Sequence, residues 1–170
     1  ILAWPGRVAK PGSVCGEFSH LIDIYPTVLE ASGLSAPRMV QGAVQKPVDG
    51  KSLMPSLAQC QPDRTRTQYF EIGGKVGLYH DGWFLSGDDG RVPWEGLPPE
   101  GERPTMRWGL YNLGADYSQF ADLARHEPER LKAMIARSDQ TAVSKNVYPL
   151  DHRFAIARGG QRGGGASGGA

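Results

Sequence analysis

Residues 68–90, QYFEIGGKVGLYHDGWFLSGDDG, decide the fold class of this 170-residue chain. Aromatic and aliphatic residues that favour strands lie on both sides of Gly73-Gly74. Two adjacent glycines suit a two-residue hairpin turn, because such a turn needs positive φ angles. The stretch therefore predicts two antiparallel strands around this turn. Residues 108–113 have the same character and are expected to add a strand, which completes a small antiparallel sheet.

A helix is predicted within residues 19–34, SHLIDIYPTVLEASGL. Asp23 is suited to cap its start, Pro26 falls in the first turn, and Gly33 is suited to end it. Leu34 is expected to fold back onto the helix, as the Schellman motif favours. The side chains expected to face inwards are Ile24, Val28 and Ala31.

A second helix is predicted from Pro128 to about Lys145, with Asn146 as its stop. Its apolar face carries Leu131, Met134, Ile135 and Ala142. The charged residues at its start, Arg125-His126-Glu127 and Glu129-Arg130, are expected to form a solvated face.

Three other segments have simpler predictions. Residues 1–4 are expected to form a buried strand closed by Pro5-Gly6, and residues 37–59 a loop with one short helix from about Ser52. Residues 91–107, rich in proline, are expected to be a loop. The glycine-rich end, residues 154–170, is expected to be a flexible tail or linker, because it has too few apolar side chains to pack. Its RGG-like sequence lacks the aromatic residues of RNA-binding segments.

Nineteen basic against eighteen acidic side chains give a formal charge of +1, so no bulk field attracts nucleic acid or an anionic membrane. No run approaches the roughly 18 apolar residues of a membrane span, and the start lacks a signal-peptide pattern. We expect that the chain is part of a longer protein, so an export signal could precede Ile1. Periplasmic, secreted and cytoplasmic locations therefore stay open. Cys15 and Cys60 permit one disulfide, but ordinary thiols are the expectation.

Several phrases together resemble the C-terminal portion of bacterial arylsulfatases, in the alkaline-phosphatase-like superfamily. They are SHLIDIYPTVLEASGL, QKPVDGKSL, TQYFEIGGKVGLYHDGW, GLYNLGADYSQFADLA and NVYPLDHR, and the resemblance covers about residues 1–153. It implies an α/β fold with two parts. Residues 1–60 would form the last strand, helix and connecting loop of the large α/β domain. Residues 61–153 would form a small antiparallel sheet subdomain packed by a helix.

The resemblance also implies hydrolysis of a small-molecule sulfate ester. The family uses a formylglycine made from the Cys of a Cys-x-Pro-x-Arg motif, beside a calcium ion held by oxygen ligands. In the family these residues precede the strand with which this chain begins. We therefore expect that this fragment binds no calcium, contains no catalytic residue and is inert alone. The calcium ligands would lie upstream, and the oligomeric state stays open.

Cys60-Gln61-Pro62-Asp63-Arg64 matches the Cys-x-Pro-x-Arg pattern. In sulfatases the x positions hold small residues, and the Cys opens a helix near the N-terminal part of the chain. Here they hold Gln61 and Asp63, and the motif leads directly into the predicted strand. We therefore interpret Cys60 as a decoy.

His80 and Trp83 follow the hairpin turn and are candidates for the wall of a substrate cleft, since such loops often carry specificity. The alternative is that His80 is hydrogen-bonded to its neighbours and that Trp83 is a core residue. Glu71 and Lys75 flank the turn and are expected to form a cross-strand pair.

Two acidic groupings resemble metal sites only superficially. His20 and Asp23 lack a third ligand, and capping explains Asp23 better. Asp88-Asp89-Gly90 lacks the further acids of a calcium loop and is expected to be a solvated turn. No metal site is predicted in this chain.

Two rival functions remain open at this stage. One is a related phosphodiesterase or phosphonate hydrolase, and the other is a non-catalytic binding module. The chain also departs from the family pattern at Gly109, where Glu is usual, and at His152, where Asp is usual, so contacts made by those acids are in doubt.

Overall fold

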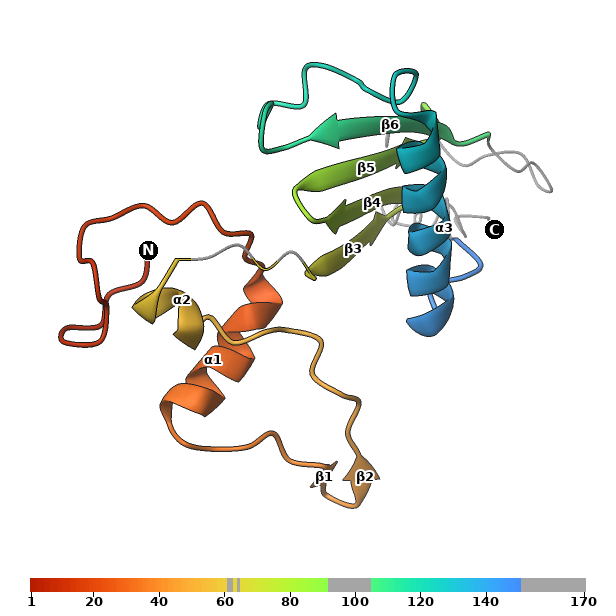
Figure 1. Ribbon diagram of the computed structural model, residues 1–170. Helices are drawn as coiled ribbons and strands as arrows, with labels where there is room; N and C mark the ends of the chain where they lie inside the picture. The colour runs from red at the N-terminus through yellow and green to blue at the C-terminus, as the bar shows by residue number, and fades with distance from the viewer. Residues whose placement is uncertain (61–62, 64, 92–104, 151–170) are drawn as a thin grey trace, which may run out of the picture. The chain divides into compact units, whose positions relative to one another are not determined.

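The structure is a computed structural model that describes residues 1–60, 63, 65–91 and 105–150. These residues belong to two compact units, Ile1–Asp63 (unit 1) and Arg64–Ala170 (unit 2). Figure 1 labels their helices and strands. In the parts of the chain that are described, no helix is long and apolar enough to cross a membrane.

Unit 2 contains a four-stranded antiparallel sheet in the order β3-β4-β5-β6. Its strands are β3 (Thr67–Ile72), β4 (Lys75–His80), β5 (Trp83–Asp88) and β6 (Arg107–Asn112). The turn at Gly73-Gly74 has φ angles of 57° and 83°, which confirms the predicted hairpin. Strand β6 confirms the expected addition to the sheet.

Residues 76–85 form two strands, so the prediction of one strand there was wrong. Asp81 and Gly82, with φ angles of 46° and 78°, make a second two-residue turn between β4 and β5. Asp-Gly is well suited to such a turn, because both positions need positive φ. The aromatic residues on either side obscured this signal in the sequence.

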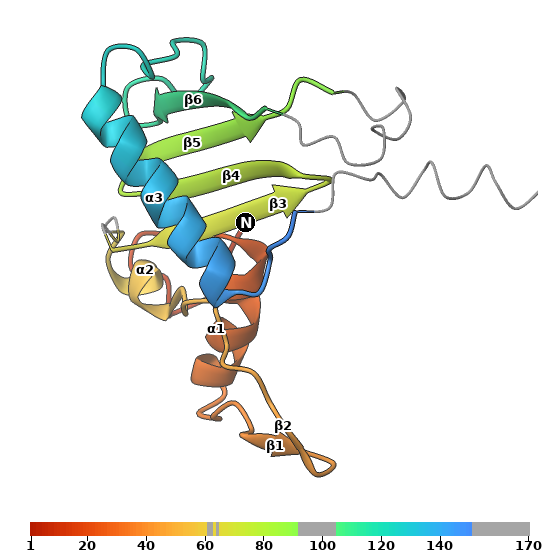
Figure 2. The same ribbon diagram turned by 90° about the vertical axis from the view of Figure 1, so that its right-hand side faces the viewer.

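Helix α3 (Pro128–Ser144) lies across one face of the sheet (Figure 2). Leu78, Leu85 and Leu110 are direct neighbours on β4, β5 and β6, and all three are fully buried beneath Met134. Leu131 and Ile135 pack against the same cluster, as the apolar face of the helix predicted.

Asn146 ends α3 as predicted, in the left-handed conformation at φ 56°. Its N–H donates to the Val143 carbonyl at 3.1 Å, and the Val147 N–H donates to the Ala142 carbonyl at 2.9 Å. This is the Schellman arrangement with asparagine in place of glycine.

The outer edge of β6 is covered by the loop that leads to α3. Asp122 Oδ1 accepts the backbone N–H groups of Leu110 and Ala124, at 3.0 and 2.9 Å. The Leu123 N–H donates to the Leu110 carbonyl at 2.8 Å. These bonds satisfy backbone groups that a bare edge strand would leave open.

The predicted Glu71–Lys75 pair does not form, because the register places these side chains on opposite faces of the sheet. Glu71 lies opposite Val76, and Lys75 lies opposite Ile72. Glu71 accepts the Gly74 N–H at 2.8 Å instead.

Unit 1 contains a 3-10 helix (Leu21–Asp23), α1 (Ile24–Ala31), β1 (Met39–Val40), β2 (Ala43–Val44) and α2 (Met54–Ala58). Helix α1 ends at Gly33 as predicted. The Gly33 N–H donates to the Glu30 carbonyl at 3.0 Å, and the Leu34 N–H donates to the Leu29 carbonyl at 2.8 Å. The β1–β2 hairpin was not predicted, although its turn at Gln41-Gly42 has positive φ at both positions.

Two burial predictions for unit 1 were wrong. Residues 1–4 form no strand, and Ile1 is fully exposed. A strand needs a neighbour to pair with, and no strand of the described residues lies beside them. The predicted inner stripe of α1 is also exposed, at 53% for Ile24 and 56% for Val28. Polar residues make contacts instead, namely Thr27 of α1 and Asp23 directly before the helix.

Candidate functional site

Four side chains form a row across the end of the unit 2 sheet. Thr67, His80, Trp83 and Asn112 are direct neighbours in the register of β3, β4, β5 and β6. We call this set the strand-end row. It lies on the sheet face that carries α3, because alternate residues of each strand share a face with the buried leucines.

His80 is held within this row by its neighbours. Its Nδ1 atom lies 2.9 Å from the Thr67 hydroxyl and 3.3 Å from the Arg66 carbonyl oxygen. Nδ1 can accept from the hydroxyl or donate to the carbonyl, according to the tautomer. Either bond fixes the plane of the imidazole ring.

Trp83 is half-buried against the leucine cluster. The Arg130 guanidinium carbon lies 4.2 Å from the centre of the indole ring, a cation–π contact. Arg130 Nε is also 3.5 Å from Glu127 Oε2. Arg130 is exposed, as expected for a solvated helix face, and it also covers the Trp83 ring. No local pattern links the two positions, which lie on different elements, so the sequence offered no signal for this contact.

The strand-end row combines the hydroxyl of Thr67, the imidazole of His80, the amide of Asn112 and the indole of Trp83. The guanidinium of Arg130 lies over this indole. Such groups can orient an anionic or polar ligand through hydrogen bonds and charge. The assignment of His80 and Trp83 to a substrate cleft stays a prediction.

Cys60 forms a disulfide with Cys15, with the Cα atoms 5.7 Å apart. The expectation of two ordinary thiols was therefore wrong. The pairing spans 45 residues, and no local pattern reveals it. While the disulfide is intact, Cys60 has no free thiol that could react as a nucleophile or be converted to formylglycine.

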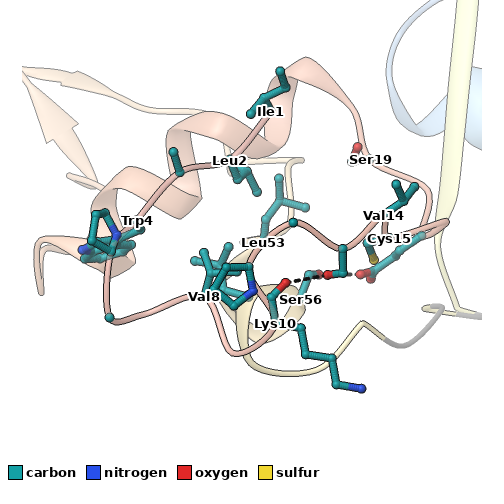
Figure 3. Close-up of a pocket in the computed structure, with 18 residues that line it drawn as sticks. Ile1, Leu2, Trp4, Val8, Lys10, Val14, Cys15, Ser19, Leu53 and Ser56 are labelled. Atoms are coloured by element: carbon teal, nitrogen blue, oxygen red, sulfur yellow. Dashed lines mark hydrogen bonds between the residues drawn. The ribbon is translucent and has the colours of Figure 1, made fainter.

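A cavity of about 740 Å³ lies in unit 1 beside Cys15 (Figure 3). Its walls come from residues 1–19 and from α2 with the residue before it. The apolar lining includes Leu2, Trp4, Val8, Leu53 and Leu57. In its polar wall the Ser56 hydroxyl donates to Glu17 Oε2. No residue of this cavity was predicted as a site.

Asp23 organises the other side of unit 1 and is only 1% exposed. Its carboxylate accepts the His20 N–H at 2.8 Å and the Lys51 N–H at 2.9 Å. The Thr27 hydroxyl donates to the Asp23 carbonyl at 2.5 Å and accepts the Leu53 N–H at 2.8 Å. Asp23 and Thr27 thus join α1 to residues 51–53. The His20–Asp23 pair is a cap of the 3-10 helix and does not form a metal site.

Gly50 completes this junction between α1 and the loop. A Cβ at this position would lie 2.1 Å from the Ile22 carbonyl oxygen, so only glycine fits. The glycine in the phrase QKPVDGKSL is therefore explained by a close backbone approach.

Lys75 binds both carboxylates of the Asp88-Asp89 turn. Its Nζ donates to Asp88 Oδ1 and lies 3.3 Å from Asp89 Oδ1. The hydrogen bond from Lys75, with a further one from the Gly90 N–H, lowers the pKa of Asp88 below its usual value. Over the described ranges, no three His, Cys, Asp or Glu residues come together to hold a metal ion. These residues therefore do not fit a calcium site.

Comparison with known proteins finds similar solved structures and no match by sequence. No family model and no curated protein matches the chain. Among solved structures it is similar to Ps i-CgsB, with a TM-score of 0.61 at 16% identity, over 91% of this chain and 31% of that chain. It is also similar to BT4656, solved with its substrate D-glucosamine-2-N,6-O-disulfate. That likeness has a TM-score of 0.50 at 14% identity, over 78% of this chain and 25% of that chain.

These neighbours are sulfatases. The chain has the fold of one part of a sulfatase. It spans about a quarter to a third of the length of these two sulfatases.

Proposed function

We propose that this chain is the C-terminal part of a sulfate ester hydrolase of the arylsulfatase type. The observation that carries the proposal is the fold, which matches a sulfatase over 91% of this chain but only 31% of the other. Phrases that resemble arylsulfatases also lie on described elements of this chain. The unit 1 junction at Asp23, for example, connects the D-I-Y-P-T helix to the D-G-K-S-L loop.

The nucleophile and the metal come from residues N-terminal to Ile1 in this proposal. Cys60 is the one match to the formylglycine motif, and its sulfur is bound to Cys15. A calcium ion would polarise the sulfate oxygens in the longer enzyme. In this proposal no step of the reaction is assigned to the described residues, and we expect the 170-residue chain to be inert alone.

The contribution of this chain is to position the substrate. In the proposal, the strand-end row forms part of the cleft wall, with His80 and Trp83 nearest the substrate. The Arg130 guanidinium on Trp83 complements the charge of a sulfate ester. The imidazole of His80 offers a ring nitrogen for a hydrogen bond to it. The glucosamine disulfate bound by BT4656 supports a sulfated sugar as the substrate class.

A first experiment tests where the nucleophile lies. The 170-residue chain is co-expressed with a formylglycine-generating enzyme and assayed with 4-nitrophenyl sulfate and calcium, with Cys60→Ala as the control. We expect no turnover from either protein. Turnover that is lost in Cys60→Ala would place the nucleophile in this chain and overturn the proposal.

A second experiment tests the reaction class on the longer protein that contains this chain. We expect it to hydrolyse 4-nitrophenyl sulfate and not bis(4-nitrophenyl) phosphate. In that protein His80→Ala and Trp83→Leu should each raise KM about tenfold with kcat little changed, since they remove binding shared by ground and transition states. Ile72→Ala, exposed on the other sheet face, is the matched control. Hydrolysis of the phosphate diester alone would favour a phosphodiesterase, and neither activity would favour a binding module.

A further inference from the structure

Unit 1 has no apolar core among its described residues. The buried hydrophobic residues of the described chain all belong to unit 2, and they are Val76, Leu78, Tyr79, Leu85, Leu110, Met134 and Ala142. Among the described residues of unit 1, Asp23 is the one buried residue, and it is polar. Because apolar burial is the main driving force for folding, unit 1 depends on hydrogen bonds and covalent links to hold its segments together.

The N-terminal segment, residues 1–19, is joined to α2 and its flanks at three places that lie close together. The Ala9 N–H donates to the Leu57 carbonyl at 2.9 Å. The Ser56 hydroxyl donates to Glu17, and Cys15 is bonded to Cys60, which follows α2. The cavity lies between the segment and α2, so these contacts also hold its two walls together (Figure 3).

Of these three contacts the disulfide is the strongest constraint. Single hydrogen bonds contribute little net stability, since water replaces them when they break. A disulfide that closes a loop of 45 residues removes many open conformations from the ensemble. The persistence of the cavity wall therefore depends mainly on the oxidation state of two sulfur atoms.

We propose that Cys15–Cys60 is a redox-sensitive clasp that holds the N-terminal segment against α2. A dithiol reductant breaks the S–S bond. Two electrons and two protons pass to Cys15 and Cys60, and the dithiol becomes a disulfide. The segment then separates from α2 and the unit 1 cavity opens. The closed form belongs to an oxidising compartment, where structural disulfides persist. This inference rests on contacts within unit 1 and does not depend on the nucleophile, metal or substrate of the proposed function.

Hydrogen exchange followed by mass spectrometry tests the clasp on the whole 170-residue chain. Exchange is compared between the oxidised protein and the same protein reduced with dithiothreitol. In peptides that cover residues 8–19 and 53–60, we expect exchange to accelerate by about 100-fold on reduction, a conservative figure for a loop of this size. Peptides from β4 and β5 contain no cysteine and should keep their rates. The double variant Cys15→Ser/Cys60→Ser should behave like the reduced protein without any reductant.

A matched control separates the disulfide from its polar neighbour. Glu17→Gln removes the charged acceptor of Ser56 and leaves both cysteines in place, so we expect less than a threefold change. If Glu17→Gln releases the segment as fully as reduction does, the disulfide is not the clasp.

Two further outcomes would overturn the proposal. One is labelling of both cysteines by iodoacetamide before any reduction, which would show that the bond is absent. The other is an equal loss of protection in α1 on reduction, which would show that the bond stabilises all of unit 1 and not the position of one segment.

Discussion

Replacement of Asp23 by alanine should weaken the junction between α1 and residues 51–53 of unit 1. Two backbone N–H groups, of His20 and Lys51, would lose a buried carboxylate acceptor. Hydrogen bonds to charged groups are each worth about 1.5–3 kcal/mol, so Asp23→Ala should cost about 3–6 kcal/mol. Asp23→Asn keeps one carbonyl oxygen and turns an NH2 group towards the other donor. It should therefore cost about half as much.

Exchange of individual amide protons, measured by NMR, reports this loss directly. A cost of about 3 kcal/mol corresponds to roughly a 150-fold faster exchange of the Lys51 amide. Glu30→Ala, on the exposed side of α1, is the matched control and should change that rate less than threefold. If the Lys51 amide exchanges less than tenfold faster in Asp23→Ala, Asp23 does not hold the loop and the reasoning fails.

Three other perturbations test unit 2. Leu85→Ala should lower the free energy of unfolding by about 3–5 kcal/mol in a urea titration, whereas Ile72→Ala, 68% exposed, should change it by less than about 0.5 kcal/mol. Equal effects would contradict the assigned core. The lowered pKa of Asp88 means that its ionised form stabilises the unit above its ordinary pKa of 3.8, and that this contribution is lost as the pH falls through the lower folded value. In Asp88→Asn the free energy of unfolding should therefore fall less steeply with pH below about pH 4. An unchanged pH dependence would refute this. A double-mutant cycle of Arg130→Met and Trp83→Leu should give a coupling of about 0.5–1 kcal/mol, and no coupling would contradict the cation–π contact.

The parts of the fold that were predictable depend on short-range backbone chemistry. Gly73-Gly74 predicted a hairpin because two residues determine that turn. Gly33 and Asn146 predicted helix ends because one residue at positive φ suffices there. In each case the decisive residues are adjacent in sequence, so tertiary contacts were not needed.

The parts that were missed depend on partners far away in the chain. Asp23 has the chemistry of a helix cap, and nothing local indicates that it also accepts the Lys51 N–H. The disulfide of Cys15 and Cys60 was missed for the same reason. Hydrophobicity predicted burial of Ile1, but burial needs a surface to pack on, and residue type alone does not supply it.

The candidate site was predictable only in part. His80 and Trp83 were selected because they flank a turn after a strand, yet their neighbours in the strand-end row come from the register of four strands. Thr67 and Asn112 carry no motif of their own. Arg130 contacts Trp83 of this row because α3 packs on the leucine cluster of the sheet.

The strand order of unit 2 has a consequence for how the chain folds. Each strand pairs with the next one in sequence, and the first two pairings close loops of only two residues. Chains with such local pairing lose little entropy before their first contacts form, and they fold quickly. Unit 1 must instead bring Cys15 to Cys60. It must also bring Lys51 to Asp23, whose carboxylate accepts the Lys51 N–H. We therefore expect the sheet to be complete early in folding, while unit 1 waits for its distant partners and for oxidation of its cysteines.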